Sequence, residues 1–155
     1  MIDKTVLCYI QKGDEYLLLY RNKKENDVNE GKYIGIGGHL ENGETKEQAL
    51  IREIKEETGL TLLHYQYRAK LLFVNDDYQE IMYLYTADKY SGELINCDEG
   101  ELVWVNKDKM LELPHWEGDQ YFLEKMMKNN NYFEMTLIYQ KDKLIKVIDK
   151  IENGI

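Results

Sequence analysis

The sequence has little of what marks several protein classes. Its two cysteines, Cys8 and Cys97, lie far apart and form no CxxC pair, so neither a zinc site nor a disulfide framework is indicated. We expect both to be ordinary buried or half-buried thiols. No apolar run approaches the ~20 residues that a membrane-spanning helix needs. The N-terminal stretch MIDKTVLCYIQKGDEY also lacks the features of a signal peptide, so we expect a cytoplasmic protein without a membrane partner.

Positive charge is scarce as well. The chain has 20 lysines and arginines against 29 aspartates and glutamates, a net charge of −9. Duplex nucleic acid is therefore not an expected partner, because phosphate contacts need clustered basic residues. A small polyphosphate can still bind an acidic protein when metal ions reverse the local charge. The length of 155 residues predicts a single domain, 1–155, with a substantial core.

Residue patterns predict a domain of strands with interspersed helices, of the α/β or α+β class. The expected strands are 5–10, 16–20, 33–38, 60–74, 80–89, 102–105, 135–140 and 144–148, and the expected helices are 45–58 and 117–128. Tight turns should join the first and the last strand pairs. The polar segment 21–32 reads as a mobile loop, and its length above the usual connection hints at a functional role.

The first predicted helix concentrates negative charge on one side. Glu53, Glu56 and Glu57 follow the i, i+3, i+4 spacing of neighbours on a helix surface. Leu50, Ile51 and Ile54 centre on an adjacent arc, which would face the sheet. The carboxylate cluster is unfavourable alone and becomes favourable around a hard divalent cation such as Mg²⁺. Solvated glutamates balanced by the basic residues of the same helix are the alternative.

The stretch GGHLENGETKEQALIREIKEETGL, residues 37–60, resembles the signature of the Nudix hydrolases. The matching positions, without deviation, are Gly38, Glu44, Arg52, Glu53, Ile54, Glu56, Glu57, Gly59 and Leu60. This resemblance implies the Nudix fold, an α/β/α sandwich around a mixed β-sheet. It also implies an enzyme that uses Mg²⁺ or Mn²⁺ to cleave nucleoside diphosphates linked to another group.

The resemblance assigns metal binding to four positions: Gly38 through its carbonyl oxygen, and the side chains of Glu53, Glu56 and Glu57. The number of metal ions is left open. Gly37 and Gly38 are expected to let the backbone turn tightly, because glycine tolerates conformations that other residues avoid.

Other site positions are supporting or catalytic candidates. Arg52 is expected to pair with Glu44 or Glu56 and to fix its orientation. Glu44 also suits the start of a helix, where a carboxylate faces the positive end of the helix dipole. The general base lies on a later loop in several members of the family, which favours Glu99, with Glu101 or a motif glutamate as alternatives.

The segment LPHWEGDQYF, residues 113–122, resembles a MutT-like subgroup that hydrolyses oxidised purine nucleoside triphosphates. The resemblance implies that Trp116 stacks on the base and that Asp119 hydrogen-bonds its edge. A packing role for Trp116 is the alternative. Tyr33 is a further candidate for the substrate pocket, and a core position is its alternative.

Two positions depart from the animal form of this subgroup: Ile34 stands where that form has an asparagine, and Gly118 stands where it has the first of two acids. The leading interpretation is nevertheless a Mg²⁺-dependent 8-oxo-dGTP diphosphatase that releases the monophosphate and pyrophosphate. The alternatives are hydrolysis of ADP-ribose, another nucleotide sugar or capped RNA, and a catalytically inactive domain that binds a nucleotide. Oligomeric state cannot be predicted from the sequence.

Overall fold

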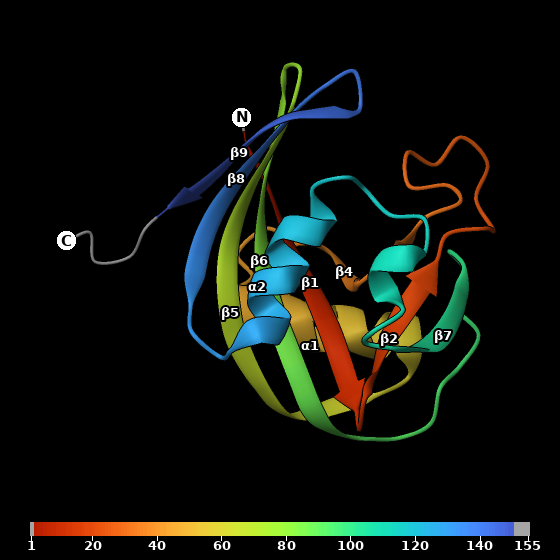
Figure 1. Ribbon diagram of the computed structural model, residues 1–155. Helices are drawn as coiled ribbons and strands as arrows, with labels where there is room; N and C mark the ends of the chain where they lie inside the picture. The colour runs from red at the N-terminus through yellow and green to blue at the C-terminus, as the bar shows by residue number, and fades with distance from the viewer. Residues whose placement is uncertain (1, 151–155) are drawn as a thin grey trace.

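One mixed sheet with a helix on each face organises the computed structural model, which describes residues 2–150 (Figure 1). The predicted domain span of 1–155 extends past this range at both ends. In chain order the elements are β1 (Asp3–Lys12), β2 (Glu15–Tyr20), β3 (Tyr33–Ile34), β4 (Ile36–His39), α1 (Lys46–Thr58), β5 (Thr61–Asn75), β6 (Tyr78–Ser91), β7 (Glu101–Asn106), the 3₁₀ helix η1 (Met110–Glu112), α2 (Asp119–Lys128), β8 (Phe133–Gln140) and β9 (Lys143–Lys150).

The strands follow the order β3-β2-β1-β6-β5-β8-β9, with β4 paired to β1 and β7 paired to β2. The β1–β6 and β5–β8 pairs are parallel, and the other pairs are antiparallel. Both predicted hairpins are present, and the closing one turns at Lys141 and Asp142, which both have positive φ. The mixed sheet and its two helices confirm the predicted α/β Nudix fold.

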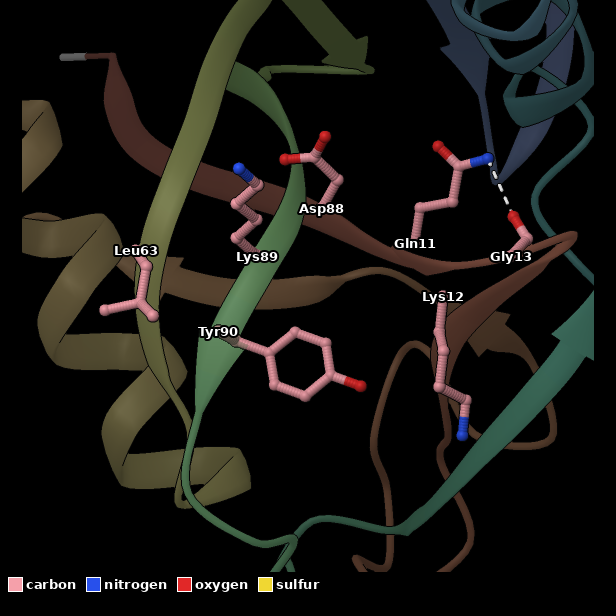
Figure 2. A pocket seen from close by; sticks show the side chains of 7 residues that line it. All are labelled: Gln11, Lys12, Gly13, Leu63, Asp88, Lys89 and Tyr90. Carbon is pink, nitrogen blue, oxygen red and sulfur yellow. Dashed lines mark hydrogen bonds between the residues drawn. The ribbon is translucent and has the colours of Figure 1, made fainter.

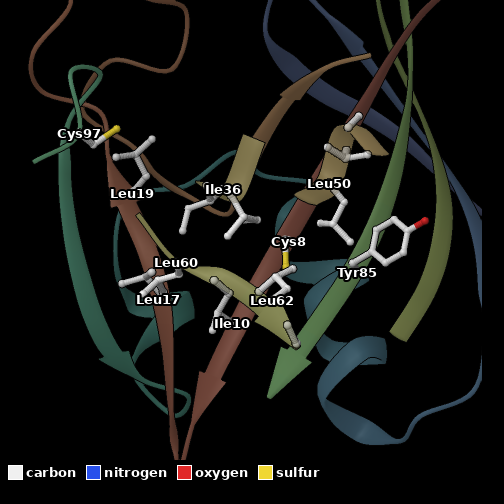
Figure 3. Close-up of a cluster of buried hydrophobic side chains, with 14 residues drawn as sticks. Cys8, Ile10, Leu17, Leu19, Ile36, Leu50, Leu60, Leu62, Tyr85 and Cys97 are labelled. Atoms are coloured by element: carbon white, nitrogen blue, oxygen red, sulfur yellow. The ribbon is translucent and has the colours of Figure 1, made fainter. Parts of the chain in front are cut away.

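Alternate side chains of β1 belong to two different hydrophobic clusters, one beneath each helix. Val6, Cys8 and Ile10 point into the cluster beneath α1, whereas Leu7 and Tyr9 point into the cluster beneath α2. This is the period of two expected for a strand that is covered on both faces. Figure 3 shows the cluster on the α1 side, where helix residues meet side chains from β1 and β2.

The strand predicted across residues 33–38 is divided into β3 and β4 by Gly35. A Cβ atom at Gly35 would lie 2.9 Å from the ring of Tyr9. The tight turn expected at Gly37 and Gly38 is wrong, because both residues lie in the extended strand β4 and pair with β1. Glycine is needed there for close approach instead, since a Cβ at Gly37 would lie 1.8 Å from the carbonyl oxygen of Val6.

A smaller difference concerns the second helix. Helix α2 begins at Asp119, two residues later than predicted, with Gly118 as its N-cap. Both cysteines are buried and free, as expected. Within residues 2–150, neither helix combines the length and apolar character required to cross a bilayer.

Candidate active site

Local sequence signals fix both ends of α1 and so set the direction of its side chains. Thr45 caps the first turn by accepting a hydrogen bond from the Gln48 backbone amide at 3.1 Å, and the Gln48 side chain accepts one from the Thr45 amide at 2.9 Å. Gly59 ends the helix with φ of 82°, as predicted. Leu50 and Ile54 are fully buried against the sheet. The acidic residues therefore line the boundary between the core and solvent.

Arg52 uses its whole guanidinium group to connect the acidic residues. Nε and Nη2 donate to the two oxygens of Glu44 at 2.7 and 2.9 Å, and Nη1 donates to Glu53 at 2.7 Å and to Glu56 at 3.2 Å. Nη2 also donates to the His39 carbonyl oxygen at 3.1 Å. The hydrogen bonds from Arg52 are the largest cause that lowers the pKa of Glu44 to about 2. Both pairings expected for Arg52 are thus present.

Glu57 is the most unusual acid of the helix, because it is only 8% exposed and its Oε1 atom has no hydrogen-bond partner. Burial raises the pKa of Glu57 well above its usual range, and the neighbouring Glu53 and the charge of Glu99 raise it further, while Arg21 opposes the shift. Gly38 packs directly against the carboxyl group of Glu53. A Cβ atom at position 38 would lie 2.5 Å from the carboxyl carbon of Glu53.

The predicted metal ligands are only partly gathered. Across residues 2–150, no three acidic, histidine or cysteine side chains converge closely enough to hold one ion. Glu53 and Glu57 adjoin each other, whereas the Glu56 side chain is 59% exposed and contacts Arg52. A buried carboxylate oxygen without a donor, next to a second carboxylate, is nevertheless a donor set that suits a hard divalent cation. The residues present therefore fit the implied metal, and metal binding by Gly38, Glu53, Glu56 and Glu57 remains a prediction.

Glu99 and Glu101 occupy different surroundings. Glu99 is near enough to Glu57 to raise its pKa, and one oxygen of Glu99 lies 2.9 Å from Nη1 of Arg21. Glu101 lies at the start of β7 and accepts a 3.5 Å hydrogen bond from the Asn22 side chain. Of the two candidates for the general base, Glu99 is the one whose charge raises the pKa of Glu57, and its catalytic role remains a prediction.

Trp116 is half-buried at a junction of aromatic rings. Its ring meets those of Phe73 and Tyr139 edge to face, with centroids 5.7 and 5.4 Å away. Its indole Nε1 donates to the Asn29 side chain at 2.7 Å, and Nζ of Lys32 lies 4.6 Å from the ring centroid. The rings fix the indole by packing, and the stacking of Trp116 on a base remains a prediction.

Asp119, the first residue of α2, lies close to Trp116 in sequence and is half-buried. Burial is the main cause that raises its pKa to about 7, and the charges of His115 and Lys32 pull in the opposite direction. The preceding Gly118 is required by packing: its amide donates to the Tyr139 hydroxyl at 2.6 Å, and a Cβ would lie 2.7 Å from that oxygen. A side chain at position 118 would therefore have to displace the Tyr139 hydroxyl.

Tyr33 and Ile34 form the short strand β3. The Tyr33 ring stacks on that of Tyr20 at 4.5 Å, and its backbone amide donates to the Pro114 carbonyl oxygen at 2.8 Å. Ile34 packs against the hydrophobic cluster beneath α1. Tyr33 is thus held beside the segment that carries Trp116, and its contact with a substrate remains a prediction.

The loop between β2 and β3 contributes residues that the sequence did not single out. Figure 1 shows it in orange, beyond the end of β2. Expected as a mobile segment, the loop is closed at its neck by backbone hydrogen bonds from Arg21 to Lys32 at 3.0 Å and from Gly31 to Arg21 at 2.8 Å. Its Asn29 side chain contacts Trp116 and its Arg21 side chain contacts Glu99. In the sequence, only the unusual length of this loop indicated that it takes part in the site.

A surface pocket of about 630 Å³ lies elsewhere, at the β1–β2 turn and beside the end of β6 (Figure 2). Its lining residues are Gln11, Lys12, Gly13, Leu63, Asp88, Lys89 and Tyr90. The lining contains none of the predicted site residues, so the chemistry described above does not extend into this pocket.

Comparison with known proteins identifies the family of this site. The family description of the NUDIX domain matches residues 1–126. The chain belongs to the Nudix family. Nudix hydrolases act on pyrophosphate bonds and generally use divalent metals such as Mg²⁺. The signature that links the chain to them includes the acids gathered around Arg52.

Relatives of this Nudix domain differ in their activities. One is named "Uncharacterized Nudix hydrolase YvcI", from Bacillus subtilis, and is 29% identical over 89% of this chain and 87% of its own length. An oxidized purine nucleoside triphosphate hydrolase from Danio rerio is 28% identical over 96% and 95%. An NAD-capped RNA hydrolase, NudC from Haemophilus influenzae, is 34% identical over 74% of this chain but only 43% of its own length.

A solved structure supports the fold. The crystal structure described as a mMutator MutT protein from Bacillus halodurans superposes with a TM-score of 0.87, covering 96% of this chain and 98% of that one at 24% identity. The superposition includes the region beyond residue 126, where the Nudix family match ends.

Proposed function

We propose that this Nudix hydrolase is a Mg²⁺-dependent pyrophosphohydrolase of oxidised purine nucleoside triphosphates, with 8-oxo-dGTP as its main substrate. The products are the monophosphate and pyrophosphate. One observation carries the proposal: the loop from Arg21 to Lys32 contacts Glu99 of the acidic group and also Trp116. A phosphate-handling group and an aromatic side chain suited to a base therefore border the same loop.

The acidic group handles the phosphates in this proposal. A divalent cation, when bound, neutralises the pyrophosphate and stabilises the charge that develops during bond cleavage. The groups that would hold it are Glu53, Glu56, Glu57 and the carbonyl oxygen of Gly38. Arg52 keeps Glu44 ionised and oriented. Glu99 accepts the proton of the attacking water, with Glu101 as the alternative.

The base binds against Trp116, which contacts the loop through the side chain of Asn29. Stacking on an aromatic face is tolerant of base identity, so discrimination must come from polar groups. Asp119 is suited to this task because its raised pKa, about 7, lets the carboxyl group carry a proton near neutral pH and donate a hydrogen bond. Tyr33 borders this side as a further candidate.

Hydrolysis of a nucleotide panel tests the proposal. Phosphate products would be measured for 8-oxo-dGTP, dGTP, ADP-ribose, a dinucleoside polyphosphate and NAD-capped RNA, each with Mg²⁺ and with chelator. We expect the highest kcat/KM for 8-oxo-dGTP and loss of activity in chelator. A higher kcat/KM for any other substrate rejects the assignment of substrate, and full activity in chelator rejects the assignment of metal dependence.

Hydrolysis of a nucleotide-capped RNA end is the second candidate. The 34% identity to NudC over 118 residues favours it, although this chain spans less than half of NudC. An inactive nucleotide-binding domain is disfavoured by the complete acidic motif.

The proposal includes a cytoplasmic location, which was expected from the sequence and is where such nucleotides occur.

A further inference from the structure

The side chain of Asp27 is largely enclosed within the polar loop between β2 and β3. This side chain is only 8% exposed, and both of its oxygens are used. Oδ2 accepts a hydrogen bond from Nε of Arg21 at 2.7 Å, and Oδ1 accepts one from the backbone amide of Asn29 at 3.1 Å. A charged side chain held this way organises the loop around itself, because each partner is a donor that the carboxylate orients.

Both partners of Asp27 reach out of the loop. Nη1 of Arg21 lies 2.9 Å from Oε1 of Glu99, and Oδ1 of Asn29 accepts a 2.7 Å hydrogen bond from Nε1 of Trp116. The result is a continuous path of polar contacts from Glu99 through Arg21, Asp27 and Asn29 to Trp116. The connected side chains come from the loop between β2 and β3, the segment before β7 and the segment before α2.

Backbone hydrogen bonds make the loop a single unit. The Glu30 amide donates to the Asp27 carbonyl at 2.9 Å, and the Lys32 amide donates to the Asn29 carbonyl at 3.0 Å. Together with the bonds at the loop neck, they leave little freedom for one end to shift without the other. A change at Asp27 should therefore reach both Glu99 and Trp116.

We propose that Asp27 is a positioning residue that holds Glu99 and Trp116 in a fixed relation to each other. Asp27 contacts neither side chain directly and acts through Arg21 on one side and Asn29 on the other. The catalytic consequence rests on the proposed function: Trp116 holds the base while Glu99 faces the reacting phosphate. A fixed spacing between the two aligns one nucleotide for hydrolysis.

Fluorescence tests the connection without any substrate. In a Trp104→Phe background, Trp116 is the only tryptophan of the chain. Asp27→Asn keeps the size of the side chain but loses the charge that Arg21 needs, and Arg21→Gln cuts the path one step further from Trp116. We expect both variants to shift the Trp116 emission to longer wavelength and to increase its quenching by acrylamide. The matched control is Glu25→Gln, which changes an exposed acid of the same loop.

Kinetics then separates positioning from a general loss of structure. Asn29→Ala should mainly raise KM, Arg21→Gln should mainly lower kcat, and Asp27→Asn should do both. The expected loss in kcat/KM for Asp27→Asn is about ten- to a hundredfold, as for one hydrogen bond to a charged group. The effects of Asp27→Asn and Asn29→Ala on KM should be less than additive, because they break one path.

The outcomes distinguish the two proposals. Unchanged Trp116 emission in both Asp27→Asn and Arg21→Gln overturns the positioning role, whether or not the enzyme hydrolyses nucleotides. A shift in these variants but not in Glu25→Gln supports it. If the emission shifts while the wild-type chain hydrolyses nothing in the nucleotide panel, the connection stands and the proposed function fails.

Discussion

Arg52 holds Glu44 with two parallel hydrogen bonds, 2.7 Å from Nε and 2.9 Å from Nη2. The Glu41 amide donates to the same carboxylate at 2.8 Å, so Glu44 also fixes the turn before α1. The remaining donors of Arg52 reach Glu53 and Glu56. One guanidinium group thus connects the helix entrance with the acids proposed to hold metal.

Replacing Arg52 by lysine should lower activity without unfolding the chain. Lysine retains the charge but cannot bind a carboxylate with two parallel donors. Each lost charge-assisted hydrogen bond contributes about 1.5–3 kcal/mol, so kcat should fall at least about tenfold. Steady-state kinetics and thermal unfolding would be compared with Lys55→Arg on the same helix. Wild-type kcat in Arg52→Lys would show that the orientation of these acids does not limit the reaction.

Metal should stabilise the folded chain through Glu57. Burial raises the pKa of Glu57, so without metal its contribution to stability is present at acid pH and is lost as pH rises. A cation bound to the folded state alone adds about 2.7 kcal/mol at a concentration one hundred times its Kd. We therefore expect Mg²⁺ to raise the Tm of the wild type at pH 8.

The variant Glu57→Gln should be more stable than the wild type in chelator at that pH and should gain less from Mg²⁺. Glu30→Gln, an exposed acid of the β2–β3 loop, serves as the control. An equal rise in Tm for Glu57→Gln and the wild type would exclude Glu57 as a ligand.

Asp119 should also make the free energy of unfolding depend on pH, and a variant at this position can measure its contribution separately from that of Glu57. Its pKa is raised to about 7 from an ordinary value near 3.8. A raised pKa in the folded state means that the stabilisation is fully present below about pH 4 and is lost as pH rises through about 7. Because Asp119 is half-buried, we expect its part to be on the order of 1–3 kcal/mol. Chemical unfolding of wild type and Asp119→Asn between pH 4 and 9 should show a difference that grows with pH.

How much of this site could be predicted depended on the sequence distance between its parts. The capping of α1, its buried stripe and its acidic edge are local, so helix periodicity was sufficient to predict where Glu53 and Glu57 lie on the helix. Their role as metal ligands stays a prediction. The Trp116–Asn29 hydrogen bond joins residues 87 positions apart. No local pattern encodes such a contact, and the β2–β3 loop therefore appeared only as a long polar segment. The need for glycine at Gly118 likewise depends on a hydroxyl 21 positions away.

The stacking role of Trp116 can be separated from its hydrogen bond to Asn29. A base–aromatic stacking contact is worth about 1–3 kcal/mol by alanine substitution, so Trp116→Ala should raise KM for 8-oxo-dGTP about ten- to a hundredfold. Trp116→Phe keeps an aromatic face and loses only the indole N–H, so it should recover most of the KM while leaving Asn29 without its donor. Trp104→Phe provides the control.

The relative size of these effects discriminates between the interpretations of Trp116. If Trp116→Phe is as defective as Trp116→Ala, the hydrogen bond to the loop rather than the aromatic face sets the affinity. If neither variant changes KM, Trp116 is a packing residue between Phe73 and Tyr139. The purine-specific substrate would then lose its main support, whereas metal-dependent hydrolysis at the acids of α1 would be unaffected, because none of their contacts involves the indole ring.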